Sequence, residues 1–192
     1  MNNDMATFFD RLAPEWDNAP SEYDKREKLT SMMGLPPNSV IADIGCGKGV
    51  MFEHLLKSKP LKIIAVDASS EMLRLAKIQF DDQRIHYVND DLLDASLPML
   101  DAAVIFNAYP HFLNKQALAG KLAQSIKNKG ILIIAHSMGR EALNVHHSGD
   151  SVSKLSTPLE AAEVEAGKFE DFFTTDVLID NDEMYFIKMS RT

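Results

Sequence analysis

The chain has one cysteine, no long apolar run and fewer basic than acidic residues. A single cysteine excludes an internal disulfide framework and fits a reducing compartment, so we expect a cytoplasmic protein. No apolar run approaches a membrane span, and the N-terminus lacks the basic start of a signal peptide. The formal net charge of −8 argues against broad binding to nucleic acids or anionic membranes, which would need a basic surface.

The remaining composition is that of an ordinary globular protein. Hydrophobic residues make up 45% and charged residues 25% of the 192 positions, which predicts one compact domain with a sizeable core. No feature of the sequence indicates an oligomeric state.

The most informative stretch joins an apolar run to a loop in which every other residue is glycine. Residues 40–44 are short, branched and apolar, as in a buried strand. Gly45, Gly47 and Gly49 follow, where the backbone can take positive φ and a ligand can approach without meeting a Cβ. Residues 51–56 then carry apolar side chains at helical spacing. A strand, a glycine loop and a helix are typical of the opening of a nucleotide-binding α/β unit.

Three kinds of glycine loop compete for this stretch. A P-loop needs Ser or Thr after its lysine, but Gly49 follows Lys48. A dinucleotide fingerprint needs its third glycine one residue later than Gly49. The third pattern, Asp-x-Gly-x-Gly-x-Gly, begins at Asp43, whose charge would repel a pyrophosphate but suits a ligand with a positive end. S-adenosylmethionine has such an end, an ammonium and a sulfonium, and has no phosphate.

At this motif the sequence resembles the class I S-adenosylmethionine-dependent methyltransferases, in particular small-molecule enzymes related to those of quinone biosynthesis. The resemblance covers most of residues 5–136. It implies that Asp67, which ends the second predicted strand, holds both ribose hydroxyls, because a carboxylate offers two acceptor oxygens. It also implies that Asp91 accepts from the adenine amino group, that the next backbone amide meets the ring, and that Asn107 touches the methionine moiety.

The resemblance therefore predicts S-adenosyl-L-methionine as cofactor and S-adenosyl-L-homocysteine as product. The predicted cofactor-binding residues are Asp43, Gly45, Cys46, Gly47, Gly49, Asp67, Ala68, Met72, Asp91, Leu92 and Asn107. Asp43 is expected near the methionine ammonium, or in a role that only orders the loop. Cys46 is expected to act through its backbone amide, because no basic partner that would activate the thiol is visible beside it.

Alternating strands and helices predict an α/β, Rossmann-like, doubly wound and mostly parallel sheet, with ligands at the carboxyl ends of its strands. The resemblance implies seven strands, a C-terminal antiparallel hairpin and N-terminal cap helices. We expect a single domain made of cap helices at 1–34, a cofactor-binding core at 38–136, a variable substrate-side segment at 137–156, and a closing helix and hairpin at 157–192. Thr157 to Glu160 reads as the N-cap, first-turn proline and capping-box glutamate of that helix.

Residues 4–17 look like an amphipathic helix with Phe8, Leu12 and Trp16 on one face. Two interpretations remain open. The helix either only caps the sheet, or is a mobile cover with Trp16 and Tyr23 facing the pocket.

Histidines near strand ends are candidates for the chemistry. His111 follows the fourth predicted strand and is the leading general base, while His136 or His147 assists or replaces it. Tyr109 is a further candidate pocket residue. His136 could instead bond to backbone, and His147 could be solvated. Three imidazoles could also hold a zinc-like or iron-like ion, but no tight spacing such as His-Glu-x-x-His is present, so we predict no metal.

These patterns together predict an enzyme that transfers a methyl group to a small molecule. The segment from Asn107 to Pro110 departs from the Asn/Asp-Pro-Pro-Tyr/Phe typical of methyltransferases that act on amino groups of nucleobases or glutamine, which disfavours such substrates. An S-adenosylmethionine- or S-adenosylhomocysteine-binding sensor or scaffold without turnover is the alternative. An NAD-dependent oxidoreductase is argued against by the early third glycine.

Overall fold

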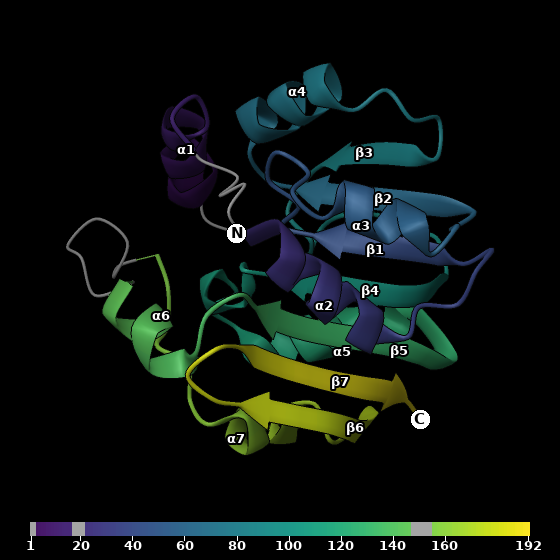
Figure 1. Cartoon of the computed structure of the whole chain (residues 1–192), viewed down its shortest axis with the longest axis vertical. Helices are drawn as coiled ribbons and strands as arrows, with labels where there is room; N and C mark the ends of the chain where they lie inside the picture. The colour runs from purple at the N-terminus through teal and green to yellow at the C-terminus, as the bar shows by residue number, and fades with distance from the viewer. Residues whose placement is uncertain (1–2, 17–21, 147–154) are drawn as a thin grey trace.

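A computed structural model describes residues 3–16, 22–146 and 155–192. Within these ranges, seven strands form one sheet in the order β3-β2-β1-β4-β5-β7-β6 (Figure 1). The first five pair in parallel, β7 runs antiparallel to β5, and β6 runs antiparallel to β7. The predicted mostly parallel, doubly wound sheet with a C-terminal antiparallel hairpin is confirmed. The strands are β1 (Val40–Ile44), β2 (Lys62–Asp67), β3 (Ile85–Asn89), β4 (Leu100–Phe106), β5 (Ile126–His136), β6 (Phe173–Asp180) and β7 (Tyr185–Arg191).

Helices cover both faces of the sheet, because the central strands are apolar on both sides. Side chains alternate along a strand, so Ile41 faces one core and Ala42 the other. The helices are α1 (Asn3–Leu12), α2 (Tyr23–Met33), α3 (Phe52–Lys57), α4 (Ser70–Gln79), α5 (Lys115–Ser125), α6 (Arg140–His146) and α7 (Ala162–Gly167), with a 3-10 turn η2 (Tyr109–His111). Leu29 of α2, Leu55 of α3 and Leu73 of α4 pack on one face. Leu118 of α5 and Ala162 of α7 pack on the other.

Side chains cap the N-termini of two helices. The Ser69 hydroxyl accepts from the Met72 amide at 3.1 Å at the start of α4, and Asn114 Oδ1 accepts from the Ala117 amide at 2.9 Å at the start of α5. Within the described ranges, no helix is both long enough and apolar enough to cross a membrane.

The closing helix begins later than predicted. It starts at Ala162 and not near Thr157, and its first turn is not a capping box. The Thr157 amide donates to the carbonyl oxygen of Pro110 at 2.9 Å, and the Leu159 amide donates to the side chain of Asn144 at 2.8 Å. Because tertiary partners satisfy these amides, the local helix signal is overridden.

Two further boundaries differ from the sequence prediction. Leu118, Leu122 and Ile126 recur at four-residue spacing, which predicts that all three lie on one helix, but Ile126 instead begins β5 and pairs with Leu100 of β4. The N-terminal helix ends at Leu12, two residues before Pro14, and does not continue to residue 17.

Candidate functional site

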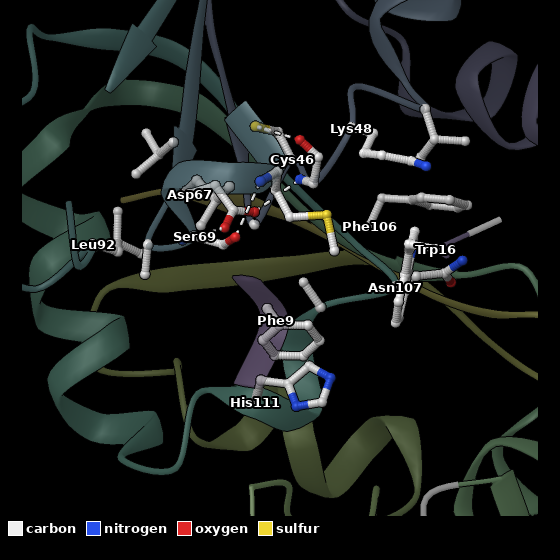
Figure 2. Close-up of a pocket in the computed structure, with 18 of the residues that line it drawn as sticks. Phe9, Trp16, Cys46, Lys48, Asp67, Ser69, Leu92, Phe106, Asn107 and His111 are labelled. Atoms are coloured by element: carbon white, nitrogen blue, oxygen red, sulfur yellow. Dashed lines mark hydrogen bonds between the residues drawn. The ribbon is translucent and has the colours of Figure 1, made fainter. Parts of the chain in front are cut away.

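A hollow of about 1090 Å³, open to solvent, lies at the carboxyl ends of β1, β2 and β4. The loops after these strands form its floor, and α1 and α2 close it from the side. Figure 2 shows the polar and aromatic side chains that converge on it. A concave, largely apolar site at this end of a doubly wound sheet is where such folds bind ligands.

The glycine loop forms part of the wall of this hollow. Gly45 and Gly47 line it with φ values of 68° and 53°, in the left-handed region that favours glycine. A Cβ on Gly45 would lie 2.7 Å from Cβ of Ala108, so the loop and the end of β4 approach closely only because this side chain is absent. Gly49 does not line the hollow. Its missing side chain instead leaves room for the ring of Phe52, which packs α3 against the sheet.

Cys46 lies in the same loop and lines the hollow, but it is 4% exposed. Burial, together with the carboxylates of Asp67 and Asp43, raises the pKa of its thiol well above the ordinary value. The thiol is therefore a poor nucleophile, as the sequence suggested.

Asp67 ends β2 and joins the glycine loop to the start of α4. Its Oδ2 accepts from the Gly47 amide at 2.8 Å, and its Oδ1 accepts from the Ser69 amide at 2.8 Å (Figure 2). Burial raises the pKa of this carboxyl, while the two amide hydrogen bonds oppose that rise. The side chain lines the hollow between Ala68 and the loop, where each carboxylate oxygen keeps capacity for a second donor.

Asp43 lies within β1, beneath the loop, and does not line the hollow itself. It is 2% exposed, and its Oδ2 has no hydrogen-bond partner among the described residues. Burial and the nearby charge of Asp67 raise its pKa from 3.8 to about 7. A buried carboxylate without a partner is costly, so a cation near the loop would stabilise its ionised form.

The segment after β3 contributes two residues to the hollow. Asp90 and Leu92 line the hollow, whereas Asp91 does not. Asp91 Oδ1 accepts from the Leu93 amide at 2.9 Å, which ties its side chain into the turn that follows the strand. Asp90 is therefore the acid of this segment that lines the larger hollow, and its Oδ1 accepts from the Asp91 amide at 2.9 Å.

Asn107 directly follows β4 and adopts a left-handed backbone with φ of 52°. Its side chain lines the hollow and is fixed by two hydrogen bonds across to the end of β5. Asn107 Oδ1 accepts from the Ser137 amide at 3.0 Å, and Asn107 Nδ2 donates to the Ser137 hydroxyl at 3.1 Å. The amide is thus rigidly held at the edge of the site.

His111 is the predicted catalytic histidine that the structure places at the hollow. Its Nδ1 lies 3.0 Å from the carbonyl oxygen of Leu155, which fixes Nδ1 as the protonated nitrogen of a neutral ring and Nε2 as the acceptor. Burial and the cation of Lys115 lower the pKa of His111, while the bond to Leu155 opposes this. The ring of Phe9 packs edge-to-face on the imidazole, with centroids 5.1 Å apart (Figure 2).

The other catalytic candidates lie elsewhere. Tyr109 is fully buried and does not line the hollow, because its hydroxyl donates to Glu165 Oε2 at 2.7 Å inside the core. His136 is also fully buried, away from the hollow, with its ring 6.0 Å from that of Tyr185. His147 falls outside the described residues. In the described part of the chain, no group of three His, Cys, Asp or Glu side chains is placed to hold a metal ion.

The cap helices contribute residues that the sequence did not single out. Met5 and Phe9 of α1 line the hollow together with Trp16, whereas Phe8 does not. Met5 and Phe9 are four residues apart, so their helical spacing could have revealed this face. Asp10 fastens α1 to the start of α4, where its Oδ1 accepts from the Ser69 hydroxyl at 2.6 Å and from the Glu71 amide at 3.0 Å.

From α2 the hollow is lined by Glu22, which precedes the helix, and by Arg26. Tyr23, which one of the two interpretations placed facing the pocket, does not line the hollow. Its ring instead packs against His54 with centroids 4.6 Å apart, and its hydroxyl accepts from Lys57. Arg26 thus lines the hollow, whereas the Tyr23 ring packs against α3.

A second hollow of about 510 Å³ adjoins the first. The two share Met5, His111 and Phe112. Leu93, Leu113 and Leu118 make much of its remaining wall apolar. His111 therefore lines both hollows, one beside the glycine loop and one beside the start of α5.

Known proteins match this chain in sequence and in fold. Residues 41–130 match the methyltransferase domain family. The malonyl-[acyl-carrier protein] O-methyltransferase of Acetivibrio thermocellus is 31% identical over 130 residues, which cover 65% of this chain and 46% of that protein. The chain spans 33% to 58% of the length of the first curated relatives that it matches.

Two solved structures share the fold along nearly the whole chain. The methyltransferase in complex with the Haloferax volcanii Trm112 methyltransferase activator has a TM-score of 0.81 at 15% identity and covers 95% of this chain and 97% of that one. N-methyltransferase NodS of Bradyrhizobium japonicum, in complex with S-adenosyl-L-homocysteine, has a TM-score of 0.73 at 12% identity and covers 98% and 99%. By the domain that matches over residues 41–130 and by its fold, this chain is similar to the S-adenosylmethionine-dependent methyltransferases.

Proposed function

We propose that this protein binds S-adenosyl-L-methionine in the larger hollow and transfers its methyl group to a small-molecule acceptor in the cytoplasm. The observation that carries the proposal is the pair of carboxylates at the glycine loop. Asp67 holds the loop from the side of the hollow, and Asp43 lies buried beneath it with one oxygen that has no hydrogen-bond partner in the described part of the chain. Two acids at this loop favour a cationic adenosine ligand and disfavour a diphosphate.

The residues present fit the cofactor along its length. Asp67 offers acceptor oxygens to the ribose hydroxyls, and Leu92 and Met72 supply apolar surface for the adenine. Asp90 offers a carboxylate near the same end. Gly45 and Gly47 let the backbone approach the methionine portion without a Cβ. When bound, the cofactor supplies an electrophilic methyl group on a sulfonium.

His111 is proposed as the general base. Its Nε2 is the acceptor nitrogen of a neutral imidazole, and it can take the proton that an acceptor hydroxyl, thiol, amine or acidic carbon loses as it attacks. Phe9, Phe112 and Met5 surround it with apolar surface that excludes water from the reacting atoms. The side chain of Asn107, which is hydrogen-bonded to Ser137, would offer a polar group to the ligands at the opposite edge of the hollow.

The second hollow supports a small, largely apolar acceptor. His111 is among its lining residues, and its leucines would contact the part of the acceptor that does not react. The relatives named above act on different acceptors. The experiment below therefore compares several chemical classes of acceptor.

The test is turnover. Purified protein is incubated with S-adenosylmethionine and panels of phenols, thiols, amines and carboxylic acids, with RNA as a separate arm, and S-adenosylhomocysteine is quantified by mass spectrometry. Methylation of a small molecule supports the proposal, and methylation of RNA alone contradicts the small-molecule assignment. Tight cofactor binding without turnover in any arm would instead favour a sensor or scaffold.

A further inference from the structure

A buried charged network lies directly behind His111 and outside both hollows. Lys115, the first residue of α5, is 9% exposed, and its Nζ donates to the carbonyl oxygen of Tyr109 at 2.6 Å. The same Nζ lies 3.6 Å from the centroid of the Tyr109 ring. One lysine thus contacts both the backbone and the side chain of the first residue of η2.

The network continues from Tyr109 to the closing helix. The Tyr109 hydroxyl donates to Glu165 Oε2 at 2.7 Å, and Glu165 is 1% exposed. The other Glu165 oxygen accepts from the Glu160 amide at 3.2 Å, and Lys168 lies 3.0 Å from Oε2. Glu165 is therefore held by α7 and its entry segment, and it passes that restraint to the tyrosine.

These contacts all act on the three-residue turn that carries His111. Lys115 bonds the carbonyl of Tyr109, and Thr157 bonds the carbonyl of Pro110 through its amide at 2.9 Å and its hydroxyl at 3.3 Å. Leu155 then accepts from the imidazole. The turn is therefore restrained at each of its residues by groups that do not line either hollow.

Packing alone does not explain two charged side chains at this place. Burying a lysine and a glutamate is costly, and apolar residues of similar volume often stabilise a core as well or better. A charge-assisted hydrogen bond to a carbonyl, however, fixes the direction of a turn in a way that an apolar contact cannot. Burial and the charge of Lys168 lower the pKa of Lys115 to about 7, and Glu165 opposes that change. The contacts of Lys115 therefore hold its amino group at a place where the charged form is poorly solvated.

We propose that Lys115 and Glu165 are positioning residues, which hold the Tyr109–His111 turn so that the imidazole of His111 faces the cofactor hollow in a single tautomer. This inference rests on the proposed role of His111 as base. Neither residue touches the hollow, so their effect on the reaction passes through His111.

The test reads the His111 ring itself by ¹⁵N NMR of the full-length protein bound to S-adenosylhomocysteine. Lys115→Met keeps the apolar stem and removes the charge, whereas Tyr109→Phe removes one hydroxyl and changes no charge. Lys121→Met is the matched control, because Lys121 lies on the same helix and its Nζ donates to the carbonyl oxygen of Ala95, on another loop, at 2.6 Å. The His111 signals are assigned by their loss in His111→Gln.

We expect one Nδ1-protonated tautomer in the wild type and in Lys121→Met, and a mixture of tautomers in Lys115→Met and Tyr109→Phe. S-adenosylhomocysteine affinity stays unchanged in both test variants, and kcat falls about tenfold while KM for S-adenosylmethionine does not move. Because Tyr109→Phe changes no charge, a tautomer mixture in this variant shows positioning and not a direct effect of the lysine charge on His111. If Lys115→Met does not fold, Tyr109→Phe alone tests the proposal.

Wild-type tautomer signals in folded Lys115→Met and Tyr109→Phe would overturn the inference. If the tautomer mixture appears but the wild type methylates nothing, the positioning network stands and the proposed function fails. The two ideas are therefore separable in one set of variants.

Discussion

The carboxylate of Asp67 accepts a hydrogen bond from the backbone amide of Gly47 at 2.8 Å. This contact joins the end of β2 to the loop after β1, and it places the acid beside the glycines in the same wall of the hollow. Figure 1 shows why the contact forms, since β1 and β2 are neighbours whose carboxyl ends meet at one edge of the sheet. The chain's own contacts thus hold Asp67 and the glycine loop together.

Gly45 and Gly120 test the glycine loop as a matched pair. Gly45→Ala should lower both stability and S-adenosylhomocysteine affinity, because its φ is 68° and the new Cβ would meet Ala108 at 2.7 Å. Gly120→Ala adds the same methyl group within α5, where nothing lies within 4 Å, and should stabilise the fold by about 1 kcal/mol. Thermal unfolding and calorimetric titration of both variants measure this. Equal effects of the two substitutions would show that the loop has no special conformational need.

We expect Asp90 and Asp91 to have different roles at the end of the hollow where the adenine would bind. We expect Asp90→Ala to weaken S-adenosylhomocysteine binding about tenfold, because this carboxylate lines the hollow. Asp91→Ala should chiefly lower the melting temperature, because Asp91 Oδ1 holds the Leu93 amide. The two readouts are calorimetric Kd and thermal melting. The reverse pattern would return the adenine contact to Asp91, as the sequence resemblance implied.

Asp43 should make stability depend on pH in a direction opposite to that of a salt-bridged acid. Its folded pKa is about 7 against 3.8 for the free side chain, so the folded state holds the proton more tightly. Its contribution to the free energy of unfolding is therefore largest below 3.8 and is lost as pH rises toward 7. Asp43→Asn removes this contribution and leaves those of the other acids.

Urea unfolding at about pH 5 and about pH 8 measures this difference. The loss of stability between the two pH values should be smaller in Asp43→Asn than in the wild type. Identical pH dependence in both proteins would mean that Asp43 is already ionised when folded. In that case the argument for a cation-seeking carboxylate beneath the loop would fail.

His111→Gln should spare cofactor binding and slow methyl transfer. Removing a general base typically costs about 10²- to 10⁴-fold in rate. Because the pKa of His111 is lowered below 6.5, the ring is neutral at pH 7, and the acid limb of the wild-type rate profile should lie below that value. Steady-state rates across pH with an identified acceptor give both results. A variant with wild-type kcat would assign the proton transfer to another group.

Much of the architecture could be predicted because local and tertiary signals agree in the core. Strand β1 begins at Val40 and ends at Ile44 as its apolar run indicates, and Ser69 and Asn114 cap the helices they precede. The start of α7 could not be predicted, because its competing partners at Pro110 and Asn144 are distant in sequence. Local patterns carry no information about such contacts.

The candidate site, too, could be predicted only in part from the sequence. The glycine loop and Asp67 are close in sequence to their strands, so a motif locates them. Tyr109 differs, because whether a residue after β4 faces the hollow or the core depends on the turn of η2 and on Glu165, which lies 56 residues further along. His136 shows the same limit, since a residue at a strand end can face either side of the sheet.

The central claim is that a cationic adenosine ligand binds against Asp67 and the glycine loop. Isothermal titration calorimetry with S-adenosylhomocysteine tests it most directly, using the wild type, Asp67→Ala and the exposed control Asp81→Ala, with NADH as the competing ligand. We predict saturable one-site binding to the wild type and to Asp81→Ala, none to Asp67→Ala, and no binding of NADH. Tight NADH binding to the wild type, or S-adenosylhomocysteine affinity unchanged in Asp67→Ala, would contradict the assignment.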